Sequence, residues 1–243
     1  MAETSVAEKK ALRAEIYEAI RVAKVGRFPG ILGRIPNFKG AEAAAERLAE
    51  LQVWRDARVL KINPDSPQRA LRARALREGK TLVMPAPKLA AELPFLLLEP
   101  DRIPPEKIWE ASSIKGSTGL GRYVSAAEVP PLDLIVTGCV AAGRDGARLG
   151  KGGGYSDLEY ALLRELDLVA ADTPIATTVH GVQLVEAGAV PMAAHDISLD
   201  LVVTPDEVVW TERTWPRPEG VDWGLLREEK VASMPVLRRL QSG

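Results

Sequence analysis

Residues 148–157 read RLGKGGGYSD and are followed directly by the helix-forming segment LEYALLREL at 158–166. Glycine accepts positive φ angles and leaves room for a ligand beside the backbone. A glycine turn that leads into a helix gathers unpaired N–H groups at the positive end of the helix dipole, and Lys151 adds a full charge there. The stretch therefore predicts a loop that binds an anion such as a phosphate group.

Two common phosphate-binding motifs do not fit this loop. A Walker loop needs four residues between its first glycine and its Gly-Lys pair, but Gly146 lies one residue too close to Gly150-Lys151, and Gly152 follows the lysine. A dinucleotide-binding fingerprint would need its third glycine at the position of Tyr155. The loop belongs to neither of these classes.

A purely structural interpretation of the loop is a long turn before a well-capped helix. Ser156 would then be the N-cap residue and Glu159 its capping-box partner. This interpretation explains residues 156–159 but gives no reason for three successive glycines beside a lysine. We therefore predict phosphate binding.

The composition is that of an ordinary globular protein, with 46% hydrophobic and 27% charged residues among 243. This length fits one α/β domain, or one domain with a small appendage. The formal net charge of −1 gives no general attraction for nucleic acid or for an anionic membrane. We therefore expect a small-molecule substrate and no nucleic acid or membrane as partner; the oligomeric state is left open.

Cys139 is the single cysteine, which excludes an internal disulfide and a zinc site made from cysteines. It lies in the apolar run DLIVTGCVAA at 133–142, so we expect a buried side chain rather than a nucleophile. The first residues lack the pattern of a secretory signal, and the apolar runs are shorter than a membrane span. These features predict a cytoplasmic protein.

Segments with helical periodicity alternate with short apolar segments along most of the chain. The continuous apolar run at 132–137 is typical of a strand in a parallel sheet covered on both faces. The alternation predicts an α/β fold with a doubly wound, mostly parallel sheet and helices on both faces. Ligands of such sheets bind at the carboxyl ends of the strands, and the glycine loop follows a predicted strand. Helices are expected at 6–25, 41–51, 68–78 and 158–170, and strands at 57–62, 81–84, 132–137, 175–179, 199–204 and 208–211.

Two long loops and a tail complete the predicted organisation. Residues 26–40 are punctuated by glycine and proline, and residues 115–121 (KGSTGLG) form a second flexible loop, interpreted as a lid or a wall on the substrate side. Residues 1–213 are expected to form a single α/β domain, and residues 214–243 a peripheral C-terminal tail with a short helix from about Ser233.

Three separated motifs resemble those of the 5-formyltetrahydrofolate cyclo-ligase family, also called methenyltetrahydrofolate synthetases. The family pattern R-L-G-x-G-x-G-Y-Y-D is similar to residues 148–157, with Lys9 and Arg13 at the spacing of the K-x-x-x-R motif on the family's first helix. His195-Asp196 and the segment 200–204 (DLVVT) are similar to the motifs that close the family's domain. The residues that match the glycine pattern are Arg148, Leu149, Gly150, Gly152, Gly154, Tyr155 and Asp157.

Other segments resemble a divergent, cyclo-ligase-like or synthetase domain-containing branch of the family. They are IPNFKGAE at 35–42, KINPDSP at 61–67, GKGGGYSDLEYALL at 150–163 and TTVHGVQLV at 177–185. Ser156 departs from the ligase pattern, in which a second tyrosine stands here. Loss of an aromatic ring beside a folate would weaken substrate positioning.

The resemblance implies a fold of the NagB/RpiA/CoA transferase-like type and an ATP- and Mg²⁺-dependent ligase. In the family's reaction ATP phosphorylates the formyl oxygen of 5-formyltetrahydrofolate, the other folate nitrogen attacks the activated carbon, and phosphate leaves. The products are 5,10-methenyltetrahydrofolate, ADP and phosphate. The alternative is a nucleotide-binding paralogue without folate activity that acts in cofactor metabolism, of folate or thiamin.

The resemblance also implies roles for individual residues. Lys9, Arg148 and Tyr155 are expected to take part in catalysis, with Tyr155 touching the formyl-bearing ring. Phosphoryl transfer needs positioning and charge neutralisation, and one helical turn separates Lys9 from Arg13, so both can face a polyphosphate. The expected nucleotide-binding residues are Lys9, Arg13, Arg148, Gly150, Lys151, Gly152, Gly153, Gly154 and Tyr155.

Asp157 is the first candidate ligand for Mg²⁺ and Asp200 the second, because Mg²⁺ binds carboxylate oxygens together with phosphates and water. Each assignment has a structural alternative: Asp157 as an N-cap and Tyr155 as a core aromatic. His180 and His195 are more typical of hydrogen-bonded structural residues than of catalysts. A basic cluster is predicted to be a solvated face or a site for a folate glutamate tail; it comprises Arg69, Arg72, Arg74, Arg77, Lys80 and Lys88.

Overall fold

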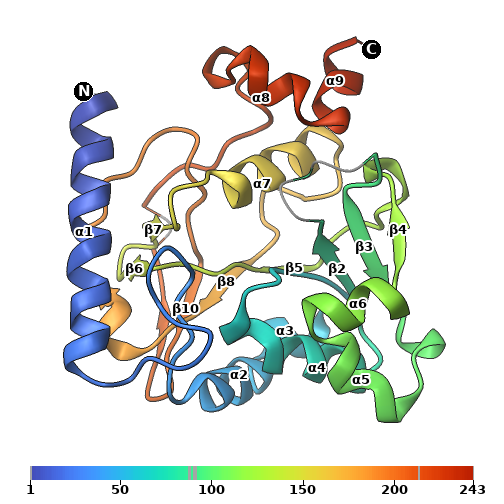
Figure 1. Ribbon diagram of the computed structural model, residues 1–243, viewed down its shortest axis with the longest axis horizontal. Helices are drawn as coiled ribbons and strands as arrows, with labels where there is room; N and C mark the ends of the chain where they lie inside the picture. The colour runs from blue at the N-terminus through green and yellow to red at the C-terminus, as the bar shows by residue number, and fades with distance from the viewer. Residues whose placement is uncertain (1, 87–88, 90–91, 213, 243) are drawn as a thin grey trace.

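The computed structural model describes residues 2–86, 89, 92–212 and 214–242 (Figure 1). An eight-stranded sheet with the order β11-β10-β8-β5-β1-β2-β3-β4 forms its centre. Its five middle strands are parallel: β1 (Val59–Ile62), β2 (Thr81–Pro85), β5 (Leu134–Val136), β8 (Ile175–Thr178) and β10 (Leu201–Val203). The remaining strands pair antiparallel at the edges: β3 (Phe95–Leu98), β4 (Arg122–Val124) and β11 (Val208–Trp210). The predicted α/β fold with a mostly parallel sheet is confirmed.

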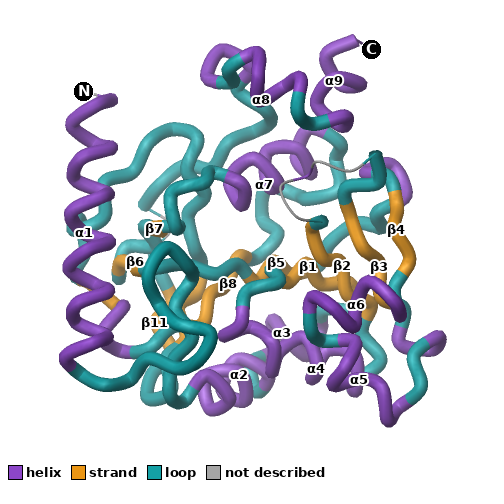
Figure 2. Tube along the Cα trace, in the orientation of Figure 1, coloured by secondary structure: helices purple, strands orange, loops and turns teal. Residues whose placement is uncertain are grey.

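Helices cover both faces of this sheet, on opposite sides in Figure 1. Side chains alternate between the two faces along a strand. Leu60 and Ile62 therefore pack against α2 (Ala41–Ala49) and α4 (Arg69–Arg77) on one face, whereas Val83 and Ile135 pack against α7 (Tyr155–Glu165) on the other. The tube trace in Figure 2 shows the same three layers. The lower layer comprises α2 (Ala41–Ala49), α3 (Gln52–Asp56), α4 (Arg69–Arg77), α5 (Ile108–Ala111) and α6 (Ile114–Leu120); α7 (Tyr155–Glu165) lies on the upper face.

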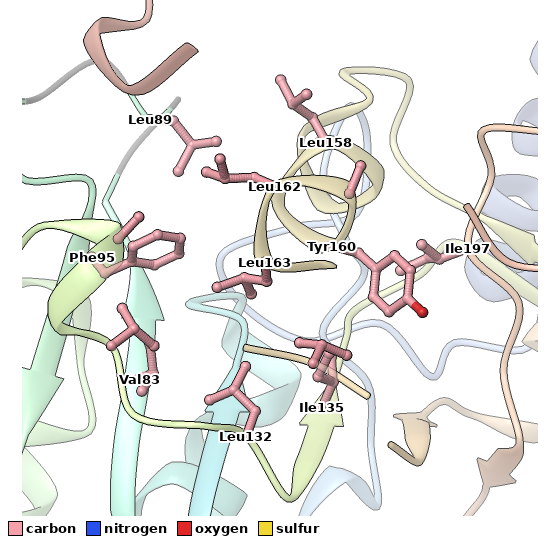
Figure 3. Packing of buried hydrophobic residues seen from close by; sticks show 14 of the residues in the cluster. Val83, Leu89, Phe95, Leu132, Ile135, Leu158, Tyr160, Leu162, Leu163 and Ile197 are labelled. Atoms are coloured by element: carbon pink, nitrogen blue, oxygen red, sulfur yellow. The ribbon is translucent and has the colours of Figure 1, made fainter. Parts of the chain in front are cut away.

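Helix α7 supplies much of the larger hydrophobic cluster. Figure 3 shows Leu162 and Leu163 of α7 close to Phe95 and Val83 of the sheet. Leu162 and Leu163 are fully buried. The sheet therefore fixes α7 along its length, and with it the position of the residues that precede its N-terminus.

A second, three-stranded sheet leads into the glycine loop. It has the order β7-β6-β9, with β6 (Ala141–Gly143), β7 (Arg148–Leu149) and β9 (Leu184–Val185). Helix α1 (Ala2–Val22) packs on it through Ile16 and Ile20. The predicted strand at 132–137 corresponds to β5. Between β5 and the glycine loop the chain forms the β6–β7 hairpin, which turns back at Gly146 with a φ of 86°.

The N-terminus of α7 differs from the predicted one. The helix begins at Tyr155 rather than 158, and its N-cap is Gly154 in the left-handed conformation, so the predicted capping box of Ser156 and Glu159 is wrong. Both side chains have other partners: Ser156 accepts a hydrogen bond from Asn63, and Glu159 pairs with Lys61. The helix ends at Glu165, five residues earlier than predicted, and Asp167 follows with a φ of 55°.

The prediction of a second flexible loop at residues 115–121 is wrong. This segment forms most of α6, which begins after the N-cap Ser113; the Ser113 hydroxyl accepts a hydrogen bond from the Gly116 N–H at 2.9 Å. The cap and the packing of α6 on α5 outweigh the low helix propensity of its two glycines. This segment is therefore a fixed wall of the structure.

The C-terminal residues pack over α7, at the top of Figure 1. They form α8 (Glu228–Ala232) and α9 (Pro235–Ser242). Val231 of α8, Leu237 of α9 and Met234 between the two helices are buried in the same cluster as Leu158 of α7. The proposed domain boundary at Arg213 lies outside the described residues and stays a prediction. Short 3-10 helices lie at Ser66–Gln68, Pro100–Arg102, Pro105–Lys107, Ala126–Glu128, Gly181–Gln183 and Trp223–Leu225.

None of the helices among the described residues has both the length and the apolar character that crossing a membrane requires.

Replacing Leu162 with alanine tests the role of α7 in the core. We expect Leu162→Ala to lower the free energy of unfolding by about 2–5 kcal/mol, because it leaves a cavity between α7 and the sheet. Urea titration monitored by circular dichroism measures the change. Leu225→Ala is the matched control, because Leu225 is 57% exposed, and we expect it to stay within about 0.5 kcal/mol of the unmodified protein. Equal losses in the two variants would contradict this account.

Candidate functional site

A cavity of about 380 Å³ opens where β1 and β2 end and α7 begins. Its walls include Asn63 after β1, Pro85 at the end of β2, and residues 153–157 at the start of α7. Residues of α6 and of the 29–35 loop complete the lining. The cavity therefore lies at the carboxyl ends of parallel strands, where such sheets bind ligands.

The glycine loop leaves a group of backbone donors unpaired beside this cavity. Gly152 and Gly154 have φ angles of 102° and 63°, which glycine adopts at little cost. The first hydrogen bond of α7 joins the Leu158 N–H to the Gly154 carbonyl at 3.1 Å. The N–H groups of residues 154–157 have no acceptor within the described part of the chain. These donors lie at the positive end of an eleven-residue helix, an arrangement that favours an anion.

Arg148 lies buried beneath the loop. Its guanidinium pairs with Asp157 at 3.2 Å and donates to the Gly138 carbonyl at 3.1 Å. Its Nε is buried without an acceptor among the described residues. Asp157 also accepts a hydrogen bond from the Ile197 N–H. Because the N-cap of α7 is Gly154, Asp157 lies in the first turn of the helix and is not its N-cap.

Helix α1 reaches the outer side of the loop. Arg13 donates from Nε to the Gly150 carbonyl at 2.7 Å, and burial lowers the pKa of its guanidinium. Lys9 forms an ion pair with Asp196. Arg13 therefore lies against the loop, whereas Lys9 is engaged by Asp196, and neither lines the cavity.

Lys151 and Tyr155 both line the cavity. The Lys151 side chain is 48% exposed, and its Nζ lies 3.7 Å from the Asp65 carboxylate. The ammonium group of Lys230, from α8, lies 5.5 Å from the centre of the Tyr155 ring, and no carboxylate among the described residues pairs with it. Lys230 was not predicted, because no motif surrounds it in the tail.

A buried polar network lies under the cavity floor and was also missed. The ammonium of Lys61 lies 2.7 Å from a Glu159 carboxylate oxygen, with side-chain exposures of 1% and 7%. Lys61 also donates to the Asn63 side-chain carbonyl, and Asn63 donates to the Ser156 hydroxyl, each at 3.0 Å. Burial raises the pKa of Glu159, and the charge of Lys61 opposes that shift. One feature of the sequence indicates this network: Lys61 lies within the apolar segment 57–62 that is predicted to be a buried strand, where a charged side chain needs a partner.

Asp200, the second predicted metal ligand, lies outside the cavity lining. Its carboxylate accepts a hydrogen bond from the Ile175 N–H at 2.7 Å and pairs with Arg217. No group of three or more His, Cys, Asp or Glu residues suited to a metal ion occurs among the described residues. Of the two predicted metal ligands, Asp157 alone lines the cavity.

The two histidines have structural contacts. The Nδ1 atom of His180 accepts a hydrogen bond from the Val182 N–H, its ring packs edge-on against Phe38, and burial lowers its pKa. The Nε2 atom of His195 lies 3.8 Å from a carboxylate oxygen of Asp196, and the His195 side chain is about half exposed.

The predicted single basic face at 69–88 is wrong. Arg72 is buried and donates to the backbone carbonyls of Asn63, Asp65 and Ser112, so it holds the turn after β1. Lys80 is also buried and donates to carbonyls at the end of α3. Lys88 lies outside the described residues. Carbonyl groups left unpaired by turns and helix ends explain why these two cations point inward.

The fold and the loop geometry define an α/β protein in which a glycine-rich loop enters a helix beside the carboxyl ends of a parallel sheet. The sequence model of the 5-formyltetrahydrofolate cyclo-ligase family matches residues 5–205. The chain therefore belongs to this family.

Individual relatives agree with this assignment. The chain is similar to the methenyltetrahydrofolate synthase domain-containing proteins of Bos taurus, with 35% identity over 234 residues, and of Homo sapiens, with 31% over 235 residues. The alignments cover 96% of this chain but 62% and 61% of those relatives. The NMR structure of Aquifex aeolicus 5,10-methenyltetrahydrofolate synthetase shares the fold, with a TM-score of 0.52 at 20% identity over 90% of this chain and 99% of that one.

Removing one partner of the buried ion pair tests the network. We expect Lys61→Met to lower the free energy of unfolding at pH 7 by about 3–5 kcal/mol, because it leaves Glu159 buried and unpaired. The loss should shrink as the pH falls, because the raised pKa of Glu159 in the folded state favours its protonation there more than in the unfolded state. Urea titrations between pH 5 and pH 8 measure both effects.

The control is the double variant Lys61→Met/Glu159→Leu, which replaces the pair with apolar side chains. We expect it to recover most of the lost stability and to lose the pH dependence. A single variant as stable as the unmodified protein at every pH would contradict the ion pair.

Proposed function

We propose that this protein is an ATP- and Mg²⁺-dependent 5-formyltetrahydrofolate cyclo-ligase, or a close family member with the same chemistry. It would form 5,10-methenyltetrahydrofolate and release ADP and phosphate. The observation that carries the proposal is the row of unpaired amides at the start of α7, which faces a cavity in a chain that belongs to this family. The proposal includes a small-molecule substrate, a cytoplasmic location and no nucleic-acid partner.

The nucleotide phosphates would bind at the glycine loop. The amides of Gly152, Gly153 and Gly154 and those of the first turn of α7 supply donors, and Lys151 supplies a mobile charge. Arg148 pairs with Asp157 beneath the loop, and Arg13 donates to the Gly150 carbonyl on its outer side. Lys9, one helical turn from Arg13, pairs with Asp196. Phosphoryl transfer depends on positioning and on charge neutralisation, which such preorganised donors provide.

Asp157 suits Mg²⁺ better than Asp200 does. An arginine engages each carboxylate, Arg148 that of Asp157 and Arg217 that of Asp200, but only Asp157 lines the cavity at the helix N-terminus. Mg²⁺ is usually held by one or two carboxylates together with substrate phosphates and water, so a single carboxylate fits this role. The ion would neutralise charge on the phosphate oxygens during transfer.

The substrate side of the cavity is partly apolar. Met84, Leu96 and Tyr123 line it together with Tyr155, and apolar and aromatic side chains suit a flat heterocyclic ring. Tyr155 would contact the formyl-bearing ring. Asp65 adds a carboxylate at the side of the cavity near Lys151.

A second candidate function rests on Ser156. The ligase pattern has a tyrosine at this position, and its loss favours a nucleotide-binding paralogue without folate activity in cofactor metabolism, of folate or thiamin. Such a paralogue would use the same glycine loop and a different small molecule.

One assay separates the two functions. Purified protein is mixed with 5-formyltetrahydrofolate and Mg·ATP, and the absorbance of methenyltetrahydrofolate is followed. Product formation at a rate proportional to the protein concentration supports the cyclo-ligase. No product, together with ATP binding in a calorimeter, supports the paralogue; no product and no ATP binding contradicts both.

Lys151→Ala tests the nucleotide site. We expect ATP affinity to fall about 10- to 150-fold, because one charge-assisted contact of about 1.5–3 kcal/mol is lost. Isothermal titration calorimetry with Mg·ATP measures the change. Lys107→Ala removes an exposed lysine from a distant 3-10 helix and should leave the affinity unchanged. Unchanged affinity in Lys151→Ala as well would contradict the loop assignment.

A further inference from the structure

We infer that the Ser156 hydroxyl donates a hydrogen bond to a carbonyl oxygen of the substrate, and that Lys61 and Asn63 fix this direction. The inference rests on the proposed function, because it concerns the substrate of the same cavity. It assigns a specificity role to a residue at which the chain departs from the ligase pattern.

Lys61 sets the donor and acceptor order of the hydrogen bonds that lead through Asn63 to Ser156. An ammonium group has three donors and no acceptor. The Lys61 Nζ lies 3.0 Å from the side chain of Asn63 and 2.7 Å from that of Glu159, and its own side chain is 1% exposed. The Asn63 atom that faces Lys61 must therefore be the carbonyl oxygen, because the amide NH₂ would meet a second donor.

The amide group then transmits this direction to Ser156. With its oxygen toward Lys61, Asn63 presents its NH₂ group to the Ser156 Oγ, 3.0 Å away. The amide nitrogen can only donate, so the serine oxygen accepts. The proton of the serine hydroxyl must therefore point to a different acceptor.

Among the described residues the Ser156 hydroxyl has no acceptor for its proton. A serine in a helix often donates to a carbonyl of the preceding turn, as Ser117 does to the Ile114 carbonyl at 2.9 Å. Ser156 has no such bond. It lies in the first turn of α7, where the preceding residues belong to the glycine loop.

The cavity is the remaining direction. Ser156, Asn63 and Glu159 all line it, so a ligand there meets a hydroxyl whose oxygen is already used and whose proton is available. Such a group favours an acceptor over a donor, and a formylated pterin offers carbonyl oxygens both on its ring and on its formyl group. A site built for one hydrogen-bond direction rejects ligands of the opposite kind, because their polar groups are left unpaired.

Ser156→Ala is the first test, measured by calorimetry with 5-formyltetrahydrofolate and, separately, with Mg·ATP. We expect substrate affinity to fall about 2- to 12-fold, the range for one net hydrogen bond. ATP affinity should not change, because the amides of α7 remain. The urea midpoint should fall, because the buried Asn63 NH₂ group loses its acceptor. Ser156→Thr keeps the hydroxyl and should keep most of the affinity.

Asn63→Asp tests the direction itself. The new carboxylate would accept from both Lys61 and Ser156, so the serine proton would turn inward and be lost to the substrate. We expect Asn63→Asp to weaken substrate binding about as much as Ser156→Ala, and the double variant to be no weaker than either single one.

Ser117→Ala is the matched control. Ser117 also lines the cavity, but its hydroxyl proton is bound to the Ile114 carbonyl, so we assign it no substrate contact and expect less than a twofold change.

Three results would overturn the inference. If the unmodified protein binds the folate and Ser156→Ala binds it equally well, the inference alone fails. If Ser156→Ala weakens ATP and folate binding alike, the serine acts on the structure of the loop and the inference again fails. If the unmodified protein binds no folate at all, the proposed cyclo-ligase function fails with it.

Discussion

The guanidinium of Arg148 ties the start of α7 to the segment that follows β5. One nitrogen donates to the Gly138 carbonyl just beyond β5, and another pairs with Asp157 in the first turn of α7. Because Arg148 is buried, losing it would leave the Asp157 carboxylate without a counterion and the Gly138 carbonyl with only a long hydrogen bond from Thr137, at a considerable cost in free energy. This contact fixes where the amides of α7 point, and the cavity takes its shape from them.

Charge around the loop is largely balanced within the protein itself. Lys9, Arg148 and Lys151 each lie beside a carboxylate. Attraction for an anion therefore comes mainly from oriented amides, which cannot be neutralised by a neighbouring side chain and need no rearrangement when a ligand arrives. Arg13 and Arg148 hold the loop in the conformation that exposes those amides, and the half-exposed Lys151 is the cation placed to contact the anion.

Much of the sheet could be predicted from the sequence, because a short and continuous apolar run such as 132–137 is typical of a strand that is covered on both faces. The antiparallel strands β3 and β4 and the hairpin of β6 and β7 were not predicted, since short edge strands carry weak patterns and depend on their neighbours. The glycine loop was predicted from residue types alone. The Lys61–Glu159 pair and Lys230 were not, because such contacts join residues about 75 to 100 positions apart.

Tyr155 touches two different parts of the molecule: its residue lines the cavity, and its ring lies under the ammonium of Lys230 from α8. The last thirty residues and the cavity thus share one aromatic side chain. Any molecule that moves this ring on entering the cavity must also change how firmly α8 is held, and by thermodynamic reciprocity the docking of α8 alters how tightly that molecule is retained. The carboxyl-terminal helices are thereby linked, through Tyr155, to the occupancy of a cavity that they do not line.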